Sequence, residues 1–595
     1  MAEFPLEQFH PARPVCWPGG LITWIKKPKM SSSYATAIAA MNQLVGFDVI
    51  IVCTGDDMQA SYWQERLEAA AGTIISRGAV VLGVSEDWNG GAGNALGTLY
   101  AFSKAAALAQ RTKGLDLRAE LEAKRMSIGL YHTAGKGTRL SPLPGAENNN
   151  KPAVKLPVPG NLTILEAVVK QTGVYGPARK GRLSVFWGDQ VFIPSQSYAL
   201  APTHDIDILC KIGPMPSSSA EWEEKGLHKY GLIAVGESGE AAQVEKVTYD
   251  VALELLRALG SVKAAGPSLG SFSVSCAMLG ALLAEFAPEL ARKNESLDTD
   301  PHLWMPLTLE QPAYVEIMAK KGMSAAAAAA HHARMRGMRA RMPPTGLGLF
   351  GAVDVGADAY WWDYGQLKLY ADNNARMADD DAEAGMMREF YGFRRGARVS
   401  RSKLGDAVAT DGASVLSGCD LGAGEIERSL LAGVTACKIE AHSAIVVNVT
   451  APSVVAAKGA LAYNVISDGP LVLGEGEVLA GVFSTTGELT VVKSHKDTDG
   501  GTAWKKAVHG NARSFEAIHL DNKGADVRRI GELGAAKHAA ARAPIAASNK
   551  ECRGPFGLPA QLSVPALGAV DTKASLLVVG LAATTFAVLS LLKRS

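Results

Sequence analysis

SIGLYHTAGKGTRLSPLP occupies residues 127–144, and NKPAV follows at 150–154. Residues 127–132 form a short apolar run of the length and composition of a buried strand. The glycines that follow can turn tightly and approach a ligand, because they lack a Cβ atom. A strand that feeds such a turn aligns several backbone N–H groups around an anion. The stretch therefore predicts an anion-binding loop at the end of a strand.

Two cations accompany this loop. Arg139 adds a planar guanidinium that suits phosphate oxygens, and Lys151 adds an ammonium group just before a proline. The spacing does not match the phosphate-binding loop with Gly-Lys-Ser/Thr, nor the dinucleotide fingerprint, which fails at Leu140. We expect a site large enough for a triphosphate, whose loop contacts come from Ala134, Gly135, Lys136, Gly137 and Thr138.

The bulk properties exclude several classes of protein. A chain of 595 residues predicts two or three domains. The net charge of +1 gives no electrostatic reason to expect a nucleic-acid partner. Seven cysteines are scattered without a C-x-x-C pair, which argues against a zinc site or a disulfide framework and favours a reducing compartment.

The loop resembles the signature of the sugar-phosphate nucleotidylyltransferases, G-x-G-T-R-L-x-P-L followed by K-P. The resemblance implies a Rossmann-like α/β domain that converts a nucleoside triphosphate (NTP) and a sugar 1-phosphate into a nucleotide-sugar and pyrophosphate. It also implies that Arg139 and Lys151 are the catalytic residues, which act by positioning and charge because the attacking phosphate is already an anion.

The order of the segments differs from the usual one in this family. Residues 47–54 and 79–84 read as strands, and a Gly-rich loop at 89–100 opens a helix. This strand–helix–strand unit would receive the base, yet it precedes the phosphate loop, so we expect a permuted parallel sheet. The order resembles that of the pyrophosphorylases that make GDP-fucose. The expected base contacts are Gly91, Gly93 and Asn94.

Two further elements complete the resemblance. A strand ending in Gly188-Asp189 and the W-x-D-x-G element at 361–365 imply that Asp189 and Asp363 hold Mg²⁺, a cation that prefers oxygen ligands. A hairpin over 228–247 resembles the family's Y-G and E-K pair, although Val247 replaces the usual proline. The implied sugar-phosphate contacts are Tyr230, Gly231, Glu245, Lys246 and Trp362.

We expect five parts along the chain. An N-terminal arm at 1–30 precedes a nucleotidyltransferase domain at 31–395, divided into the base-binding unit at 31–125 and the phosphate, metal and sugar sites at 126–395. Aliphatic steps separated by small residues predict a left-handed β-helix at 396–535, a solenoid that is a possible surface for homo-oligomers. An Ala/Pro/Ser-rich linker is expected at 536–572.

The C-terminal end predicts a membrane anchor. Residues 575–592 read SLLVVGLAATTFAVLSLL without a charge, which meets the length of a spanning helix. We expect a transmembrane tail anchor at 573–595 that holds a cytoplasmic enzyme on the cytosolic side of an organelle membrane.

The sequence thus predicts a nucleotide-sugar pyrophosphorylase. UTP with glucose 1-phosphate is the preferred pair, because the loop and the W-x-D-x-G element resemble those of glucose-1-phosphate enzymes. GTP with fucose 1-phosphate or mannose 1-phosphate is the alternative, on segment order. A non-catalytic regulatory subunit that binds nucleotide-sugars is a third possibility.

Overall fold

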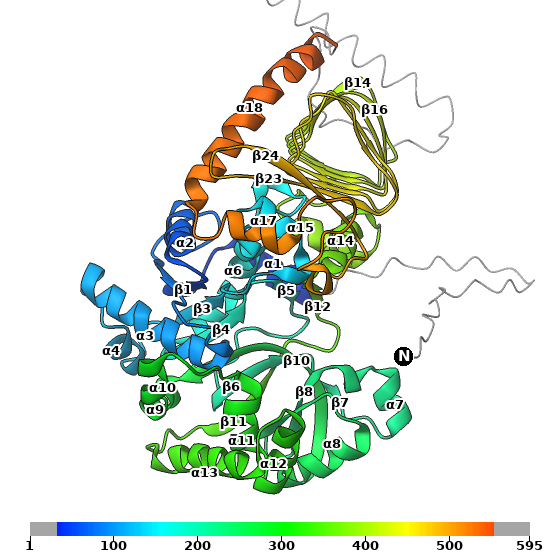
Figure 1. The fold of residues 1–595 in the computed structure, drawn as a ribbon. Coiled ribbons are helices and arrows are strands. Elements are labelled where there is room, and N and C mark those ends of the chain that lie inside the picture. The colour runs from blue at the N-terminus through cyan, green and yellow to red at the C-terminus, as the bar shows by residue number, and fades with distance from the viewer. Residues whose placement is uncertain (1–31, 553–595) are drawn as a thin grey trace, which may run out of the picture.

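The structure is a computed structural model that describes residues 32–552, and a mixed ten-stranded sheet lies at its centre (Figure 1). Four strands that the apolar runs predict pair in parallel in the order β2-β1-β3-β4. Their carboxyl ends therefore meet at one edge, where ligands of such sheets bind. These strands are β1 (Val49–Thr54), β2 (Val80–Ser85), β3 (Ile128–His132) and β4 (Arg182–Trp187).

Side chains alternate across the parallel strands, so each strand contributes to two cores. In β1, Ile50 and Val52 join one hydrophobic cluster, whereas Val49 and Ile51 join the other. This double burial explains why these strands read as continuous apolar runs. The first cluster includes residues of α1 (Ser32–Asn42), α2 (Asp57–Ala69) and α6 (Ile164–Thr172); the second includes residues of α3 (Gly93–Lys113), α4 (Leu117–Glu122) and α9 (Cys276–Glu285).

The other side of the sheet is antiparallel in part. β10 (Val262–Ser275) runs antiparallel to β4 and β6 (His204–Cys210), and β11 (Gly348–Asp354) pairs in parallel with β6. The first half of β10 carries β7 (Gly213–Pro214) and the hairpin of β8 (Gly231–Gly236) and β9 (Ala241–Glu245). Helices packed around this half are α7 (Ser219–Glu224), α8 (Tyr249–Leu255), α11 (Met305–Thr308), α12 (Gln311–Lys320) and α13 (Ala325–Arg341), whereas α10 (Ala287–Arg292) packs against α3 and α9.

A small antiparallel pair lies beside the large sheet. β5 (Gln190–Ile193) directly follows β4 and pairs with β12 (Tyr360–Asp363). Helices α14 (Leu367–Ala375) and α15 (Ala382–Phe390) follow β12 and lead to the next domain.

The next domain is a parallel β-helix, seen end-on in Figure 1. Val415 pairs with Leu430 and Leu430 with Ile445, so one coil takes fifteen residues. Left-handed backbone at Gly433 and Asn448 turns successive coils at equivalent corners. One sheet consists of β13 (Val399–Ser400), β15 (Val415–Ser417), β17 (Leu430–Ala432), β19 (Ile445–Val447), β21 (Leu461–Tyr463), β23 (Glu477–Phe483) and β24 (Leu489–His495); the other of β14 (Lys403–Thr410), β16 (Asp420–Glu427), β18 (Thr435–His442), β20 (Ser453–Ala456) and β22 (Leu471–Leu473).

One face of the β-helix shares a core with the first domain. Leu431 and Val446 point into the β-helix, whereas their neighbours Leu430 and Ile445 join the cluster that contains α1, α2 and α6 residues. A strand with both faces covered by apolar neighbours cannot show polar alternation, and all three residues of β17 are buried. The β-helix is therefore packed onto the half of the first domain that contains α1, α2 and α6.

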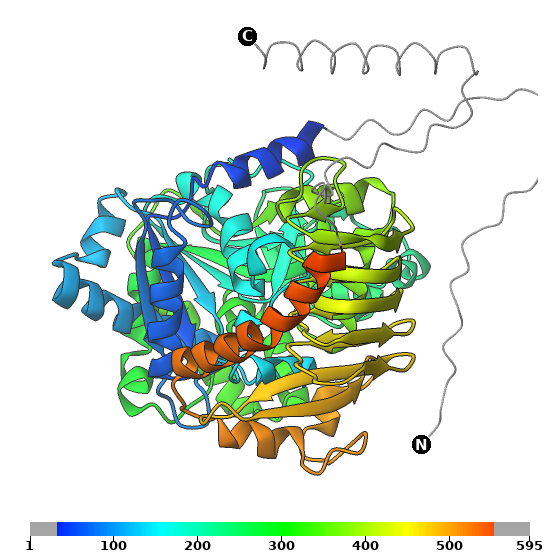
Figure 2. The same ribbon diagram turned by 90° about the horizontal axis from the view of Figure 1, so that it is seen from above.

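The chain then returns to the first domain. After β24 come α16 (Gly500–Ala503) and α17 (Phe515–Asp521), and α18 (Val527–Cys552) crosses the coils of the β-helix (Figure 2). His538 of α18 contacts the Thr450 hydroxyl through a 3.2 Å hydrogen bond, and Asn549 donates to the Ala436 carbonyl. Residues 536–552, expected in a linker, thus belong to a helix packed on the β-helix.

The prediction of a membrane-spanning tail is corrected. Among residues 32–552, no helix combines the length and the apolar character that crossing a bilayer requires. The predicted anchor at 573–595 falls outside the described residues, as do the predicted arm at 1–30 and the last part of the predicted linker. The transmembrane and tail-anchored description is withdrawn, and with it the location on an organelle membrane.

Candidate functional site

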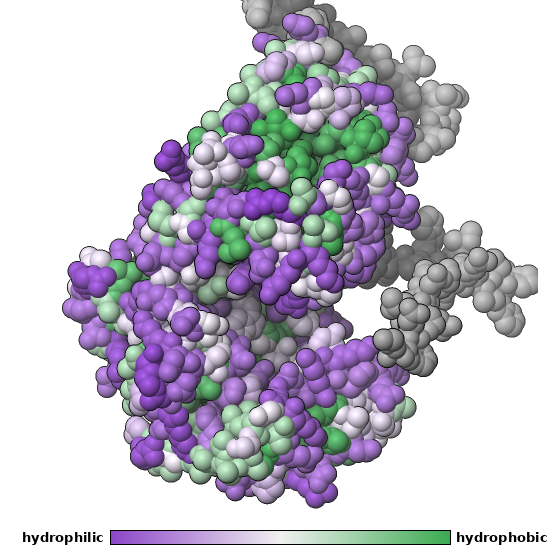
Figure 3. All heavy atoms as spheres, viewed as in Figure 1, coloured by the Kyte–Doolittle hydropathy of each residue, from purple (hydrophilic) through white to green (hydrophobic). Residues whose placement is uncertain are grey.

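A cleft of about 940 Å³ lies at the carboxyl ends of β1 to β4. Figure 3 shows the surface hollowed between the half that carries the β-helix and the half that carries α11 to α13. The cleft brings together most of the nucleotide-site residues expected from the sequence. Its lining includes Gly91, Gly93, Asn94, Ala134, Gly135, Lys136, Gly137, Thr138, Arg139, Lys151 and Asp189.

The glycine loop runs from the end of β3 to a short 3-10 helix, η1 (Thr138–Leu140). Gly137 adopts φ 67°, and a Cβ atom added there would lie 2.8 Å from the Cβ of Lys151. Gly135 has open space around the same position. Gly137 is thus the glycine on which the approach of Lys151 to the loop depends, because an alanine would meet both backbone strain and a collision.

Two carboxylates converge beside Lys151. Strand pairing places Asp363 opposite Gln190, and the Tyr364 N–H donates to the Asp189 carbonyl at 2.8 Å. A Cβ atom added at Gly365 would lie 2.9 Å from Asp363 Oδ1 and 3.1 Å from Asp189 Oδ2, so both oxygens approach one point. The small β5–β12 pair is therefore the element that joins the two acids.

The electrostatics of the two acids suit a cation. Burial raises the pKa of Asp363, and the negative charge of Asp189 raises it further, while the charges of Lys151 and Arg139 lower it. Lys151 Nζ donates to Asp189 Oδ2 at 2.5 Å. Carboxylate oxygens that approach one another are the hard donors that Mg²⁺ prefers, so these residues fit that ion.

The Gly-rich loop at 89–94, which the sequence predicts to receive the base and which we call the base loop, is held by the segment that follows α10. Gly93 has φ 70°, and a Cβ atom there would lie 2.4 Å from the Leu297 carbonyl oxygen. The Asn94 side-chain oxygen accepts the Thr299 N–H at 2.7 Å, so the Asn94 side chain holds the loop in place. The backbone of Gly90 and Gly91 remains along the cleft wall.

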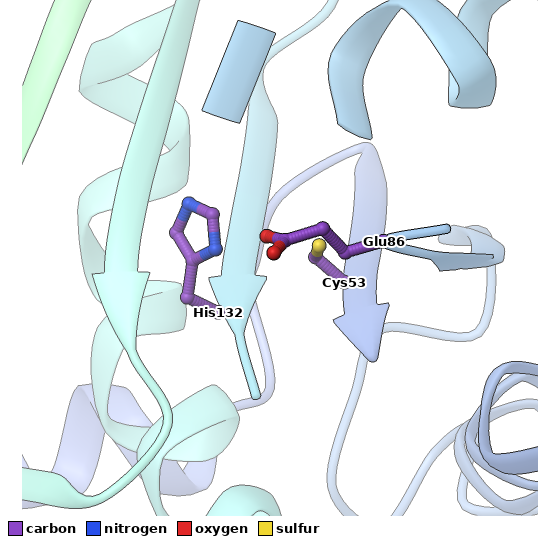
Figure 4. A group of neighbouring side chains, drawn as sticks. All are labelled: Cys53, Glu86 and His132. Carbon is purple, nitrogen blue, oxygen red and sulfur yellow. The ribbon is translucent and has the colours of Figure 1, made fainter. Parts of the chain in front are cut away.

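Three side chains at the ends of β1, β2 and β3 point toward one another (Figure 4). One ligand atom each from Cys53, Glu86 and His132 lies within 4.8 Å of the others. Burial raises the pKa of the Cys53 thiol and lowers that of His132 to about 4. Glu86 accepts the N–H of Ala92 at 3.0 Å. Glu86 is thus the member of this group that holds the turn leading into α3.

The expected sugar-phosphate residues do not line the cleft. Trp362 is fully buried, and its indole N–H donates to Glu383. Because side chains alternate along β12, Trp361 lies on the same face as Asp363, and its ring centroid is 6.4 Å from that of Tyr230. Trp361 is therefore the tryptophan on the cleft side of this strand.

The remaining sugar-side candidates sit on the β8–β9 hairpin with Gly231. Lys321 Nζ donates to Glu245 at 3.0 Å, and the Lys246 side chain is 66% exposed. Both charges project from the hairpin outside the lining of the cleft.

One part of the lining, which no sequence motif predicts, comes from the chain after the β-helix. We call residues 499–527 the return segment. It begins beside η1, because a Cβ atom at Gly500 would lie 2.2 Å from the Thr138 carbonyl oxygen. Its cleft-lining residues are His519, Asn522, Lys523, Gly524, Ala525 and Val527.

Comparison with known proteins adds little to this description. No family model matches the chain, and no curated protein matches it. One of the matching solved structures is HddC from Yersinia pseudotuberculosis complexed with GMP-PN, at 11% identity and a TM-score of 0.18, over 55% of this chain and 97% of that one. Similarity at this score carries no information about activity.

Proposed function

We propose that the protein is a nucleotidylyltransferase that joins an NTP to a sugar 1-phosphate and releases pyrophosphate. One observation carries the proposal: Asp189 and Asp363 approach a single point beside Lys151, in a cleft that the glycine loop and Arg139 also line. Two acids and two cations around a glycine-rich turn suit a reaction between two phosphate anions.

The reaction needs orientation and charge more than proton transfer. An oxygen of the sugar phosphate attacks the α-phosphorus, and the bond from that phosphorus to the bridging oxygen of the β-phosphate breaks, so that the electron pair leaves on pyrophosphate. Lys151 would stabilise the charge on the α-phosphate oxygens. Arg139 and the N–H groups of the glycine loop would hold the terminal phosphates.

Asp189 and Asp363 would hold Mg²⁺. The ion, when bound, supplies positive charge that offsets the repulsion between the two reacting anions. Lys151 lies against Asp189 and would share that carboxylate with the cation.

Two pairs of substrates are candidates. UTP with glucose 1-phosphate is preferred on the sequence elements around the two acids. GTP with fucose 1-phosphate or mannose 1-phosphate is favoured by one structural observation: Glu86 lines the cleft beside the base loop. A carboxylate accepts hydrogen bonds only, so it suits the donor groups of a guanine edge.

A pyrophosphate-release assay of the purified protein tests the proposal. Four nucleoside triphosphates are crossed with glucose, fucose and mannose 1-phosphates in buffer containing Mg²⁺. We expect one combination to release pyrophosphate well above the others. If no pair turns over while calorimetry detects nucleotide-sugar binding, the non-catalytic regulatory function replaces the enzyme.

A further inference from the structure

Basic side chains from two parts of the chain lie at one end of the cleft, and only Lys136 belongs to the sequence motif. Lys136 belongs to the glycine loop and Lys523 to the return segment, and both line the cleft. His519 of α17 lies near both ammonium groups: burial lowers its pKa first, and the charges of Lys136 and Lys523 lower it further. Positive charge from two distant parts of the chain thus collects at one place.

Neither lysine is paired with an acid anywhere in the described part of the chain. Other lysines near the cleft are paired: Lys151 with Asp189, and Lys104 with Asp87 at 3.1 Å. Both charges lie near His519 without a counter-ion, and an anion bound between them would be attracted to both. The cluster therefore has the charge pattern of a polyanion site.

The return segment is fixed in place on two sides. The Asn149 side chain donates to the His519 carbonyl at 2.7 Å, and the Asn522 side chain donates to the Phe483 carbonyl at 2.8 Å. Just beyond it, Arg528 forms a 2.7 Å ion pair with Glu65 of α2. Lys523 is thereby held at the cleft before any ligand binds, which reduces the entropy lost on binding.

We propose that Lys523, together with Lys136, binds the terminal phosphates of the NTP and the pyrophosphate that leaves. The inference rests on the proposed function, which assigns the adjacent glycine loop to the same phosphates. It gives the return segment a role: this segment follows the β-helix in the chain and supplies residues that complete the phosphate end of the cleft.

The test uses the full chain and three variants. Lys523→Gln removes the charge, Lys523→Arg keeps it, and Lys505→Gln is the matched control, because Lys505 is an exposed lysine of the same segment outside the cleft lining. Calorimetry in buffer with Mg²⁺ measures the binding of inorganic pyrophosphate and, separately, of UMP and GMP. Melting temperatures establish that each variant is folded.

We expect Lys523→Gln to weaken pyrophosphate binding by about tenfold or more, the effect of losing one charge-assisted contact. Binding of the monophosphates should not change, because they lack the terminal phosphates. Lys523→Arg should retain most of the affinity, and Lys505→Gln all of it. Unchanged pyrophosphate binding in Lys523→Gln, or an equal loss in Lys505→Gln, would overturn the inference.

These outcomes are separate from those of the proposed function. If the wild type releases pyrophosphate from a substrate pair but Lys523→Gln binds pyrophosphate normally, the enzyme stands and the role of Lys523 falls. If pyrophosphate binding depends on Lys523 but no pair turns over, the anion site stands and the transferase falls.

Discussion

At the scale of single residues, Gly137 and Gly135 make a matched pair within one loop. Gly137→Ala would force an alanine into left-handed backbone and against Lys151, whereas Gly135→Ala would meet open space. We expect Gly137→Ala to lower kcat/KM by about tenfold or more, because a misplaced cation loses much of its effect. Gly135→Ala should stay near wild type. Steady-state kinetics of both variants, with melting temperatures, check this expectation.

The charged residues of the cleft give a second prediction. Arg139→Ala and Asp189→Asn should each lower turnover by about 10²-fold or more, because preorganised charge carries the proposed rate enhancement. Arg257→Ala and Asp372→Asn, two exposed positions away from the cleft, are the controls. Near-normal turnover in both cleft variants would contradict the mechanism.

Some of this site is readable from the sequence because its signals are local. The turn at 134–139 and Asp189 follow the ends of β3 and β4 directly, so their convergence follows from a parallel sheet, and Lys151 belongs to the same motif as the turn. The choice of Trp362 over Trp361 fails for a physical reason: a strand alternates its faces, and one register step moves a side chain from cleft to core.

At the scale of elements, the docking of α18 depends on a buried histidine. His538 is 3% exposed among Asn448, Thr450 and Asn464 of the β-helix. Burial, with the charge of Arg542 and then that of Lys155, lowers the pKa of His538 to about 3. The unfolded chain, with a histidine pKa of about 6.5, therefore binds the proton first as the solution is acidified.

This difference in pKa between the folded and the unfolded chain fixes the direction in which stability changes with pH. The contribution of His538 is fully present above pH 6.5 and is lost progressively as the pH falls toward 3, reaching about 2 kcal/mol of destabilisation at pH 5. His538→Gln, which stays neutral, should show a smaller loss of stability between pH 7 and pH 5. Urea unfolding at the two pH values measures the difference, and an equal loss in both proteins would contradict the prediction.

The elements of the β-helix were predicted less completely than those of the sheet. Aliphatic steps separated by small residues predict a solenoid, but they do not predict the fifteen-residue coil of its regular part. Single residues such as Gly433 and Asn448 turn the chain at the corners in left-handed backbone, and the spacing of aliphatic residues does not reveal where these corners lie. Nothing in the local sequence distinguishes the outer apolar residues that meet the first domain from the inner ones that fill the coil.

At the scale of the whole molecule, the return segment could not be foreseen. His519 and Lys523 reach the cleft from the segment that follows the β-helix, almost 400 residues after Lys136, so no motif spacing connects them to Lys136. Their position depends on long-range contacts, above all the bonds that Asn148 and Asn149 make to the carbonyls of Val527 and His519. Such contacts follow from how two domains pack, which periodicity does not encode.

The core that the two domains share leads to a prediction about whether they unfold together. Tyr463 of the β-helix is fully buried, donates to the Glu147 carboxylate and accepts the Lys155 N–H at 2.7 Å. Tyr463→Phe would leave both groups short of a partner and should lower the free energy of unfolding by about 1–3 kcal/mol. Tyr249→Phe is the control, because within residues 32–552 the Tyr249 hydroxyl makes no hydrogen bond.

Two probes show whether this loss of stability affects one domain or both. No tryptophan lies within the coils at 396–495, but Trp504 packs beside Val482 and Val492 of the β-helix. In a Trp504→Phe background, tryptophan fluorescence therefore reports the first domain, and hydrogen exchange of the strand amides reports the β-helix. Since Leu430, Ile445 and Tyr463 belong to the core of the first domain, both probes should shift together in Tyr463→Phe. A shift confined to fluorescence, with exchange of the β-helix amides unchanged, would mean that the two domains unfold separately.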